Sequence, residues 1–296
     1  ANGGPIPAWS PREAEIPDGR PGRRRCVGGG THSSRGHLLV EDAALAFVLD
    51  AHVLDAGGGL PTVRLERGQV DAARPVARDE PQLEAAGLVA EAVAGVVARG
   101  ERPLAVLGDC CQAIGVVAGL DRAGLRPTLV WLDSHGDFNT PETTLSGFLG
   151  GMPLAMLTGR GDLRMVRAVG LAPIPDHRVV LSDGRDLDPR ERDLVRDSGI
   201  AFLPDLDDLL AALPQGPLHV HFDSDILDAG EAPAFLYAVA GGPSAARMRA
   251  VLARLMATGR VVAVSVCAAW DVARDTEGRT LRAVETALEG IDVAPR

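Results

Sequence analysis

The chain lacks lysine altogether: all 30 of its basic residues are arginines, against 40 acidic residues, and its formal net charge is −10. A protein that binds phosphates of nucleic acids needs concentrated basic residues, so this balance argues against a nucleic-acid partner. Asparagine is nearly as rare and occurs only at Asn2 and Asn139. Both shortages are typical of a genome that is poor in AT-rich codons. An asparagine inside a motif is therefore harder to attribute to chance.

Cysteines and long apolar runs are scarce as well. The four cysteines, at positions 26, 110, 111 and 267, are too few and too scattered for a disulfide framework in 296 residues. No apolar run reaches the ~18 residues that a membrane helix needs, and no N-terminal apolar segment resembles a signal peptide. We therefore expect a cytoplasmic protein without a membrane partner.

The composition changes near residue 38. Residues 1–38 are rich in Gly, Pro and Arg and show little periodic hydrophobicity, which predicts a flexible tail. Hydrophobic residues make up 46% of the whole chain, which suits one α/β domain with a sizeable core over residues 39–296.

Within this domain, strand patterns alternate with helix patterns. We expect strands over 62–68, 104–108, 128–132, 178–183, 200–204, 217–225 and 260–266. We expect helices over 43–54, 81–100, 189–197, 245–259 and 280–290, with a further helix beginning at 111. This alternation predicts a mainly parallel sheet covered on both faces, with ligands at the carboxyl ends of its strands. No G-x-G-x-x-G turn joins an early strand and helix, which weakens a nucleotide-binding interpretation.

The most informative segment is WLDSHGDFNTPETTLSGFLGGMP, residues 131–153. The apolar strand 128–132 leads directly into Asp133, His135 and Asp137. Because side chains of an extended chain alternate between faces, these three side chains can converge on one point. Carboxylates with an imidazole suit divalent manganese, iron or zinc.

A second strand repeats the pattern, since PLHVHFDSD (217–225) ends in Asp223 and Asp225. A lone aspartate after a strand is usually a helix cap or a loop residue. Five candidate ligands at the ends of two strands favour a metal site instead.

These segments resemble the arginase (ureohydrolase) family. The matching blocks are DSHGDFNTPETTLSG, GMP, GRDLD (184–188), DSDILD (223–228) and the glycine pair 241–242, and the resemblance covers about residues 100–290. It implies a three-layer α/β/α fold and two Mn²⁺ ions bridged by a hydroxide, which hydrolyses a guanidine or another linear amidine. It also implies a homo-oligomer, a trimer or a hexamer.

The resemblance assigns six metal ligands: Cys110, Asp133, His135, Asp137, Asp223 and Asp225. Cys110 stands where the family has a histidine, after the strand 104–108. A thiolate binds zinc and iron well but is softer than manganese prefers. The alternative is that Cys110 is an inert buried cysteine, in which case only one metal site is fully formed.

Four further residues match the family's contacts with the head group of an α-amino acid. Asn139, Thr144 and Ser146 correspond to contacts with the α-carboxylate, and Asp188 corresponds to the contact with the α-amino group. Simpler roles exist, because Asn139 suits a turn and Asp188 suits the cap of the helix that follows it.

The opposite end of the expected substrate site departs from the family. Gly150 replaces a histidine used in proton transfer or substrate contact, and Ala268 replaces a glutamate that pairs with the guanidinium. Asp271 is a candidate substitute for that glutamate. The changes at Cys110 and Gly150 also resemble a branch of arginase-like enzymes that hydrolyse Nω-hydroxy-L-arginine. That branch keeps the glutamate, so the match is partial.

The sequence thus predicts a metal-dependent hydrolase that cleaves a C–N bond of a linear amidine or guanidine in an amino-acid-like small molecule. Asp137 is expected to orient the nucleophilic hydroxide. No side chain at position 150 can protonate the leaving group, so we expect a substrate with a better leaving group than arginine. Nω-hydroxy-L-arginine is one candidate, and another amidine less basic than arginine is open. The alternative is a non-catalytic protein that keeps the fold with a degenerate site.

Overall fold

The computed structural model describes residues 50–54, 62–64 and 80–291. The expected tail over 1–38 and the domain boundary after it lie outside these residues, so both stay predictions. The expected helix over 43–54 is wrong in its described part, because Asp50–Leu54 forms a strand, β1. Its backbone pairs with two other strands, and a short apolar pattern of this kind suits helix and strand alike.

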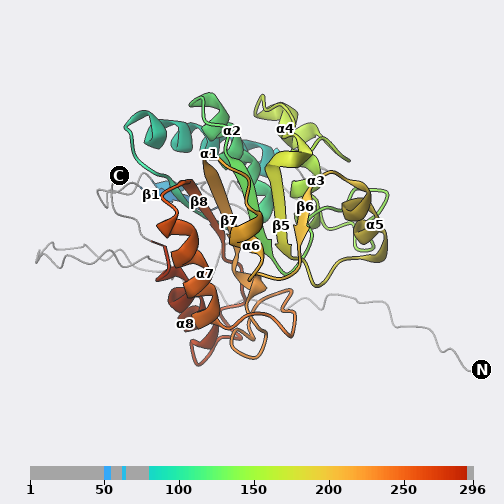
Figure 1. The fold of residues 1–296 in the computed structure, drawn as a ribbon, viewed down its shortest axis with the longest axis vertical. Helices are drawn as coiled ribbons and strands as arrows, with labels where there is room; N and C mark the ends of the chain where they lie inside the picture. Colours follow the sequence, from blue (N-terminus) through green and yellow to red (C-terminus); the bar gives the residue numbers. More distant parts are fainter. Residues whose placement is uncertain (1–49, 55–61, 65–79, 292–296) are drawn as a thin grey trace, which may run out of the picture. The chain divides into compact units, whose positions relative to one another are not determined.

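The strands of the described residues form one sheet (Figure 1). After β1 they are β2 (Thr62–Arg64), β3 (Leu104–Leu107), β4 (Thr128–Asp133), β5 (Val179–Asp183), β6 (Ala201–Leu203), β7 (Leu218–Asp223) and β8 (Val261–Cys267). Their order across the sheet is β2-β1-β3-β8-β7-β4-β5-β6. The six strands from β3 to β6 in this order are parallel, as expected, whereas β1 runs antiparallel to both neighbours.

Helices connect the parallel strands. The α-helices of the described residues are α1 (Glu80–Ala98), α2 (Ala113–Arg122), α3 (Pro153–Leu157), α4 (Arg164–Ala168), α5 (Pro189–Asp197), α6 (Leu209–Ala212), α7 (Ala245–Ala257) and α8 (Arg279–Leu288). Short 3₁₀ helices are η2 (Cys110–Gln112), η3 (Leu149–Gly151), η4 (Asp176–Arg178) and η5 (Ser224–Ile226). None of these helices is both long and apolar enough to cross a membrane.

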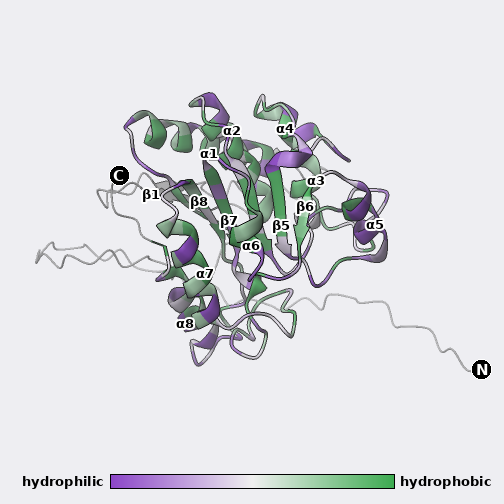
Figure 2. Cartoon of the chain, viewed as in Figure 1, coloured by the Kyte–Doolittle hydropathy of each residue, from purple (hydrophilic) through white to green (hydrophobic). Residues whose placement is uncertain are grey.

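Helices cover both faces of the sheet, because alternate residues of a strand enter different cores. In β4, Leu129 and Trp131 belong to the core that α1 and α2 cover, whereas Val130 and Leu132 belong to the core that α7 and α8 cover. Strands that are buried on both faces have continuous apolar sequences. Figure 2 shows β5, β7 and β8 as mainly hydrophobic, in contrast to the mostly hydrophilic α5. The structure therefore confirms the three-layer α/β/α fold.

Neighbouring strands end together at one edge of this sheet. β3, β8, β7 and β4 are adjacent in the sheet order and run parallel, so their carboxyl ends meet. Asp223 is paired in register with Cys267, and Cys267 with Leu107. In open α/β sheets this edge is where ligands bind.

Candidate metal centre

The structure brings all six expected metal ligands to this edge. Asp133 ends β4, Asp223 ends β7, and Cys110 begins η2 just after β3. Three overlapping groups of ligand atoms each lie within 4.8 Å of one another: Asp133, His135 and Asp225; Cys110, Asp133 and Asp137; and Cys110, Asp223 and Cys267. Shared members link the three groups, so they form one candidate metal centre.

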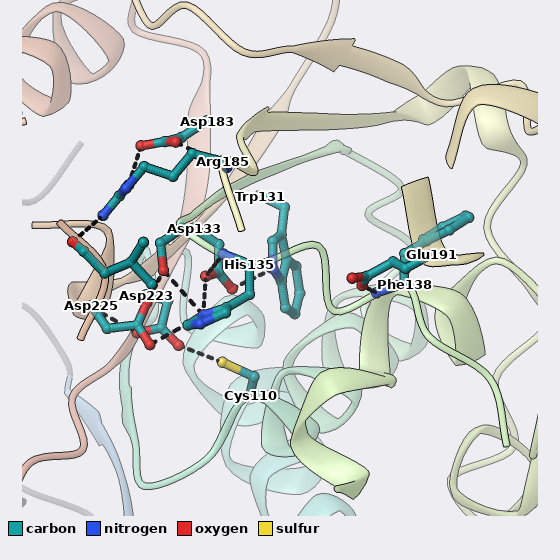
Figure 3. Close-up of polar contacts among 12 residues, drawn as sticks. Cys110, Trp131, Asp133, His135, Phe138, Asp183, Arg185, Glu191, Asp223 and Asp225 are labelled. Atoms are coloured by element: carbon teal, nitrogen blue, oxygen red, sulfur yellow. Dashed lines mark hydrogen bonds and ion pairs between the residues drawn. The ribbon is translucent and has the colours of Figure 1, made fainter. Parts of the chain in front are cut away.

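At one end of this centre, His135 lies between two carboxylates (Figure 3). Its Nδ1 is 3.4 Å from Oδ1 of Asp133 and 3.3 Å from Oδ2 of Asp225. Burial alone lowers the pKa of His135, but hydrogen bonds and charges of the two aspartates outweigh it and raise that pKa to about 12. The two carboxylates thus favour a positive charge at His135, and the same three side chains form one of the groups that could hold a divalent cation.

Two aspartates lie at the other end, where the charge of His135 offsets only part of the rise in the pKa of Asp137. Burial and the charge of Asp133 raise the pKa of Asp137 well above its ordinary value, and burial and the charge of Asp225 do the same for Asp223. Among the hydrogen bonds of the described residues, none reaches the buried Oδ2 of Asp137. Asp137 also has a positive φ of 48°, a strained conformation that is common at functional sites. A buried, unpartnered carboxylate oxygen among other carboxylates fits a divalent cation.

Cys110 lies at the same centre, where its thiol donates a hydrogen bond of 2.8 Å to Oδ2 of Asp223. Burial raises the pKa of this thiol well above its ordinary value. The neighbouring Cys111 belongs to the same hydrophobic core as Cys110, but its thiol contacts the carbonyl of Leu149. That Cys110 binds metal stays a prediction, but its location agrees with that role.

Cys267 is a member of the centre that the sequence did not predict. It ends β8 and shares a group of candidate ligand atoms with Cys110 and Asp223. The only sequence signal is its position at the end of an apolar strand. That signal becomes informative only when β8 is known to lie beside both β3 and β7.

Glu191 supports the loop that carries the ligands and was also missed. Its Oε1 accepts a hydrogen bond of 2.8 Å from the backbone N–H of Phe138, next to Asp137, and its Oε2 accepts one of 3.1 Å from the N–H of Asp188. A Cβ on Gly136 would lie 2.5 Å from Oε1 of Glu191, so a larger residue there would have to displace this carboxylate. Burial raises the pKa of Glu191 to about 7. An acidic residue three positions after a cap, as in Asp188-Pro-Arg-Glu191, is the pattern that could have indicated it.

The four expected head-group residues lie close together. Nδ2 of Asn139 donates a hydrogen bond of 3.2 Å to Oδ2 of Asp188, and the hydroxyls of Thr144 and Ser146 are 3.4 Å apart. The backbone N–H of Leu145, between those two, lies 3.4 Å from the same oxygen of Asp188. Asp188 is also the N-cap of α5. Their contacts with a substrate stay predictions.

The region around Gly150 is occupied by aromatic side chains. A Cβ on Gly150 would lie 2.4 Å from the ring of Phe148. That ring packs on Tyr237 at a centroid distance of 5.2 Å, and the Tyr237 ring meets the edge of the His135 ring at 6.4 Å. Phe148 and Tyr237 remain 37% and 49% exposed, so both rings also face solvent.

The other altered positions offer no obvious replacement for the missing glutamate. Ala268 is buried. The carboxylate of Asp271 accepts a hydrogen bond of 2.9 Å from the N–H of Ala273, two residues further on. The hydrogen bond that this carboxylate accepts is therefore local to its own turn.

The fold and this centre define an α/β protein with a carboxylate-rich candidate metal site, and comparisons with known proteins specify its family. A family model described as Arginase family matches residues 54–289, so the chain belongs to the arginase family. It is 35% identical to an Nω-hydroxy-L-arginine amidinohydrolase from Streptomyces lavendulae over 49% of this chain and 53% of that one. It is 37% identical to an arginase from Bacillus caldovelox over 54% of this chain and 58% of that one. The match thus spans little more than half the length of these relatives.

Solved structures agree with this assignment. The arginase structure from Bacillus caldovelox superposes with a TM-score of 0.65 at 28% identity, covering 73% of this chain and 78% of that one. The formimidoylglutamase from Bacillus subtilis gives a TM-score of 0.58 at 15% identity, covering 72% of this chain and 69% of that one. The second likeness concerns the fold alone.

Proposed function

We propose that the protein is a metal-dependent hydrolase that cleaves a C–N bond of a guanidino or amidino group in an amino-acid-like substrate. The observation that carries this proposal is the set of three overlapping ligand groups at the carboxyl ends of β3, β4, β7 and β8. Membership of the arginase family and the names of the relatives support it.

The donor set indicates which ions fit. The group of Asp133, His135 and Asp225 consists of carboxylates and one imidazole, which suits Mn²⁺, whereas the thiol of Cys110 in the other two groups suits a softer ion. We propose two divalent ions, held by the six expected ligands. When bound, such ions would supply a nucleophile at neutral pH, because a divalent ion lowers the pKa of the water that it binds.

Residues of the chain itself orient the reaction. The unpartnered Oδ2 of Asp137 is available to accept a proton or a hydrogen bond from the nucleophile, which fixes the direction of attack. Glu191 fixes the backbone N–H of Phe138 and so limits how far Asp137 can move. The side chain of His135 is 26% exposed, so the centre is open to solvent on this side.

We infer that the substrate carries an α-amino acid head group. Asp188 is an anionic acceptor for an α-ammonium group, and Asn139 and the hydroxyls of Thr144 and Ser146 are donors for an α-carboxylate. The contacts among these four residues support a shared binding role. A charge-assisted hydrogen bond to a carboxylate is worth about 1.5–3 kcal/mol, enough to select for the head group.

For the tail, we propose Nω-hydroxy-L-arginine over arginine. Gly150 carries no proton donor for a leaving group, and Ala268 carries no charge for a guanidinium. Leaving a buried cation without a partner costs about 3–5 kcal/mol. A hydroxyguanidine is less basic than a guanidine and therefore suffers less from both losses.

A non-catalytic arginase-fold protein is the alternative, and the losses at Gly150 and Ala268 favour it. Metal analysis followed by a screen of guanidino and hydroxyguanidino amino acids for released amine separates the two. A hydrolase holds up to two divalent ions per chain and turns over at least one compound of the screen. A degenerate protein holds few ions and turns over none. The homo-oligomer and the cytoplasmic location expected from the family stay predictions.

A further inference from the structure

We propose that Cys267 is a metal ligand, so that one position of the centre is held by two thiolates, from Cys110 and Cys267, and by the carboxylate of Asp223. We call this the thiolate position, and we propose that it binds Zn²⁺ in preference to Mn²⁺. The inference deepens the proposed function and rests on it, because it concerns the identity of one of the two ions.

The geometry of the strand ends produces this arrangement. Cys267 is the last residue of β8, in register with Asp223 on one side and with Leu107 of β3 on the other. Cys110 follows β3 and hydrogen-bonds Asp223. The candidate ligand atoms of the three residues lie within 4.8 Å of one another. Ligands on a tetrahedral zinc ion with bonds of about 2.3 Å are about 3.8 Å apart, so small side-chain movements suffice to close the site.

Both thiols are removed from solvent, which suits a structural or tightly held ion. Cys110 is 6% and Cys267 is 4% exposed, and both belong to the core on the α1 and α2 face. A buried cysteine is often only a small hydrophobic residue. Here two buried thiols share a carboxylate neighbour at the edge of the sheet where ligands bind, and together they form a ligand set. The adjacent Cys111 is an internal comparison, because it belongs to no such group among the described residues.

The chemistry of the two ends of the centre then differs. Thiolates favour zinc over manganese, whereas carboxylates with one imidazole accept manganese readily. Asp133, His135 and Asp225 supply only oxygen and nitrogen donors. We therefore expect one thiophilic ion at the thiolate position and a harder ion at the other end.

The test uses the full-length protein, stripped of metal in the presence of a phosphine reductant and titrated with Co²⁺. Thiolate-to-cobalt charge transfer absorbs in the near ultraviolet, with an intensity that scales with the number of bound thiolates. Cys267→Val should remove about half of this intensity. It should also lower the ratio of bound Zn²⁺ to bound Mn²⁺ when the protein is offered both ions. Cys111→Ala should leave the intensity and this ratio unchanged. A Cys267→Val protein with the full parental band would overturn the proposal.

A measurement on the unaltered chain guards against a misfolded variant. With one equivalent of Zn²⁺, X-ray absorption should count two sulfur neighbours at about 2.3 Å from zinc. One sulfur neighbour or none would contradict the thiolate position. The two proposals can fail separately. If zinc has two sulfur neighbours but no guanidino compound is turned over, the proposed function is rejected and the thiolate position stands. If a guanidino compound is turned over but zinc has one sulfur neighbour, the thiolate position is rejected and the proposed function stands.

Discussion

The thiol of Cys110 lies 2.8 Å from Oδ2 of Asp223, although the two residues are 113 positions apart in the chain. The parallel sheet produces this contact, because β3 and β7 both adjoin β8 and end at the same edge. A cysteine thus stands beside the carboxylates where the family resemblance expects a histidine.

Replacing Cys110 tests whether its thiol holds metal. Cys110→Ala should lower the bound divalent metal by up to one ion per chain, since it removes one ligand without a substitute. Cys110→His should preserve or raise manganese binding, because an imidazole suits manganese better than a thiolate does. Metal content after equilibration and gel filtration measures both. If Cys110→Ala binds as much metal as the parent, Cys110 serves only in core packing.

Glu191 should give the metal-free protein a specific pH dependence. Its pKa is about 7 in the folded protein and near 4.5 when unfolded. Between these values only the unfolded state is ionised, so the folded state holds the extra proton and stability falls as pH rises from 4.5 to about 7. The loss amounts to about 3 kcal/mol, at 1.36 kcal/mol for each pH unit.

Glu191→Gln removes this titrating group and should reduce the fall in stability over this range by about 3 kcal/mol. The part of the fall that comes from Asp137 and Asp223, whose pKa values are also raised, should remain. Urea unfolding midpoints between pH 4 and 8, measured with a chelator present, give the comparison. The exposed Glu285→Gln in α8 is the matched control and should follow the parent. Parallel profiles for parent and Glu191→Gln would show that another group controls stability in this range.

Asp188 should select for the α-amino group. Asp188→Ala should raise KM for an α-amino-acid substrate by about 10- to 150-fold, which corresponds to the 1.5–3 kcal/mol of a charge-assisted contact. Asp188→Asn can keep the cap of α5 while losing the charge, so it should raise KM as well. The exposed Asp186→Ala, two positions earlier, should leave KM unchanged. Equal turnover of substrates with and without the α-amino group by the parent would count against this role.

Phe148 should limit any attempt to restore a histidine at position 150. A side chain there meets the ring of Phe148 at 2.4 Å, so Gly150→His must displace that ring from Tyr237. We expect Gly150→His combined with Phe148→Ala to raise arginine hydrolysis by more than the product of the two single effects, by up to about 10²-fold, the lower range of general acid–base help. Steady-state kinetics of the four proteins measure this. Additive effects would mean that Phe148 does not obstruct position 150.

Sequence patterns sufficed to predict the parallel strands and the candidate ligands that adjoin them. Asp133, His135 and Asp137 follow a continuous apolar run, so their position at a strand end needed no tertiary information. β1 could not be assigned in this way, because its five residues become a strand through pairing with β2 and β3. A local pattern does not contain that pairing.

Residues that act across the sheet were beyond local patterns as well. Cys267 joins the centre because β8 lies between β3 and β7, an order that sequence periodicity does not determine. Glu191 reaches Phe138 from α5, over 53 positions. The ring of Phe148 fills the space beside Gly150 only in the folded loop.

The most direct test of the proposed function is the ratio of kcat/KM for Nω-hydroxy-L-arginine to that for arginine, measured on the metal-loaded protein. Gly150 and Ala268 remove a proton carrier and a counter-charge from the guanidinium end, and the hydroxylated tail depends less on both. We expect a ratio above one, with ornithine formed from the hydroxylated compound. A ratio below one, with robust hydrolysis of arginine, would contradict the inference that Gly150 and Ala268 disfavour arginine. Turnover of neither compound would contradict the choice of tail and favour the non-catalytic alternative.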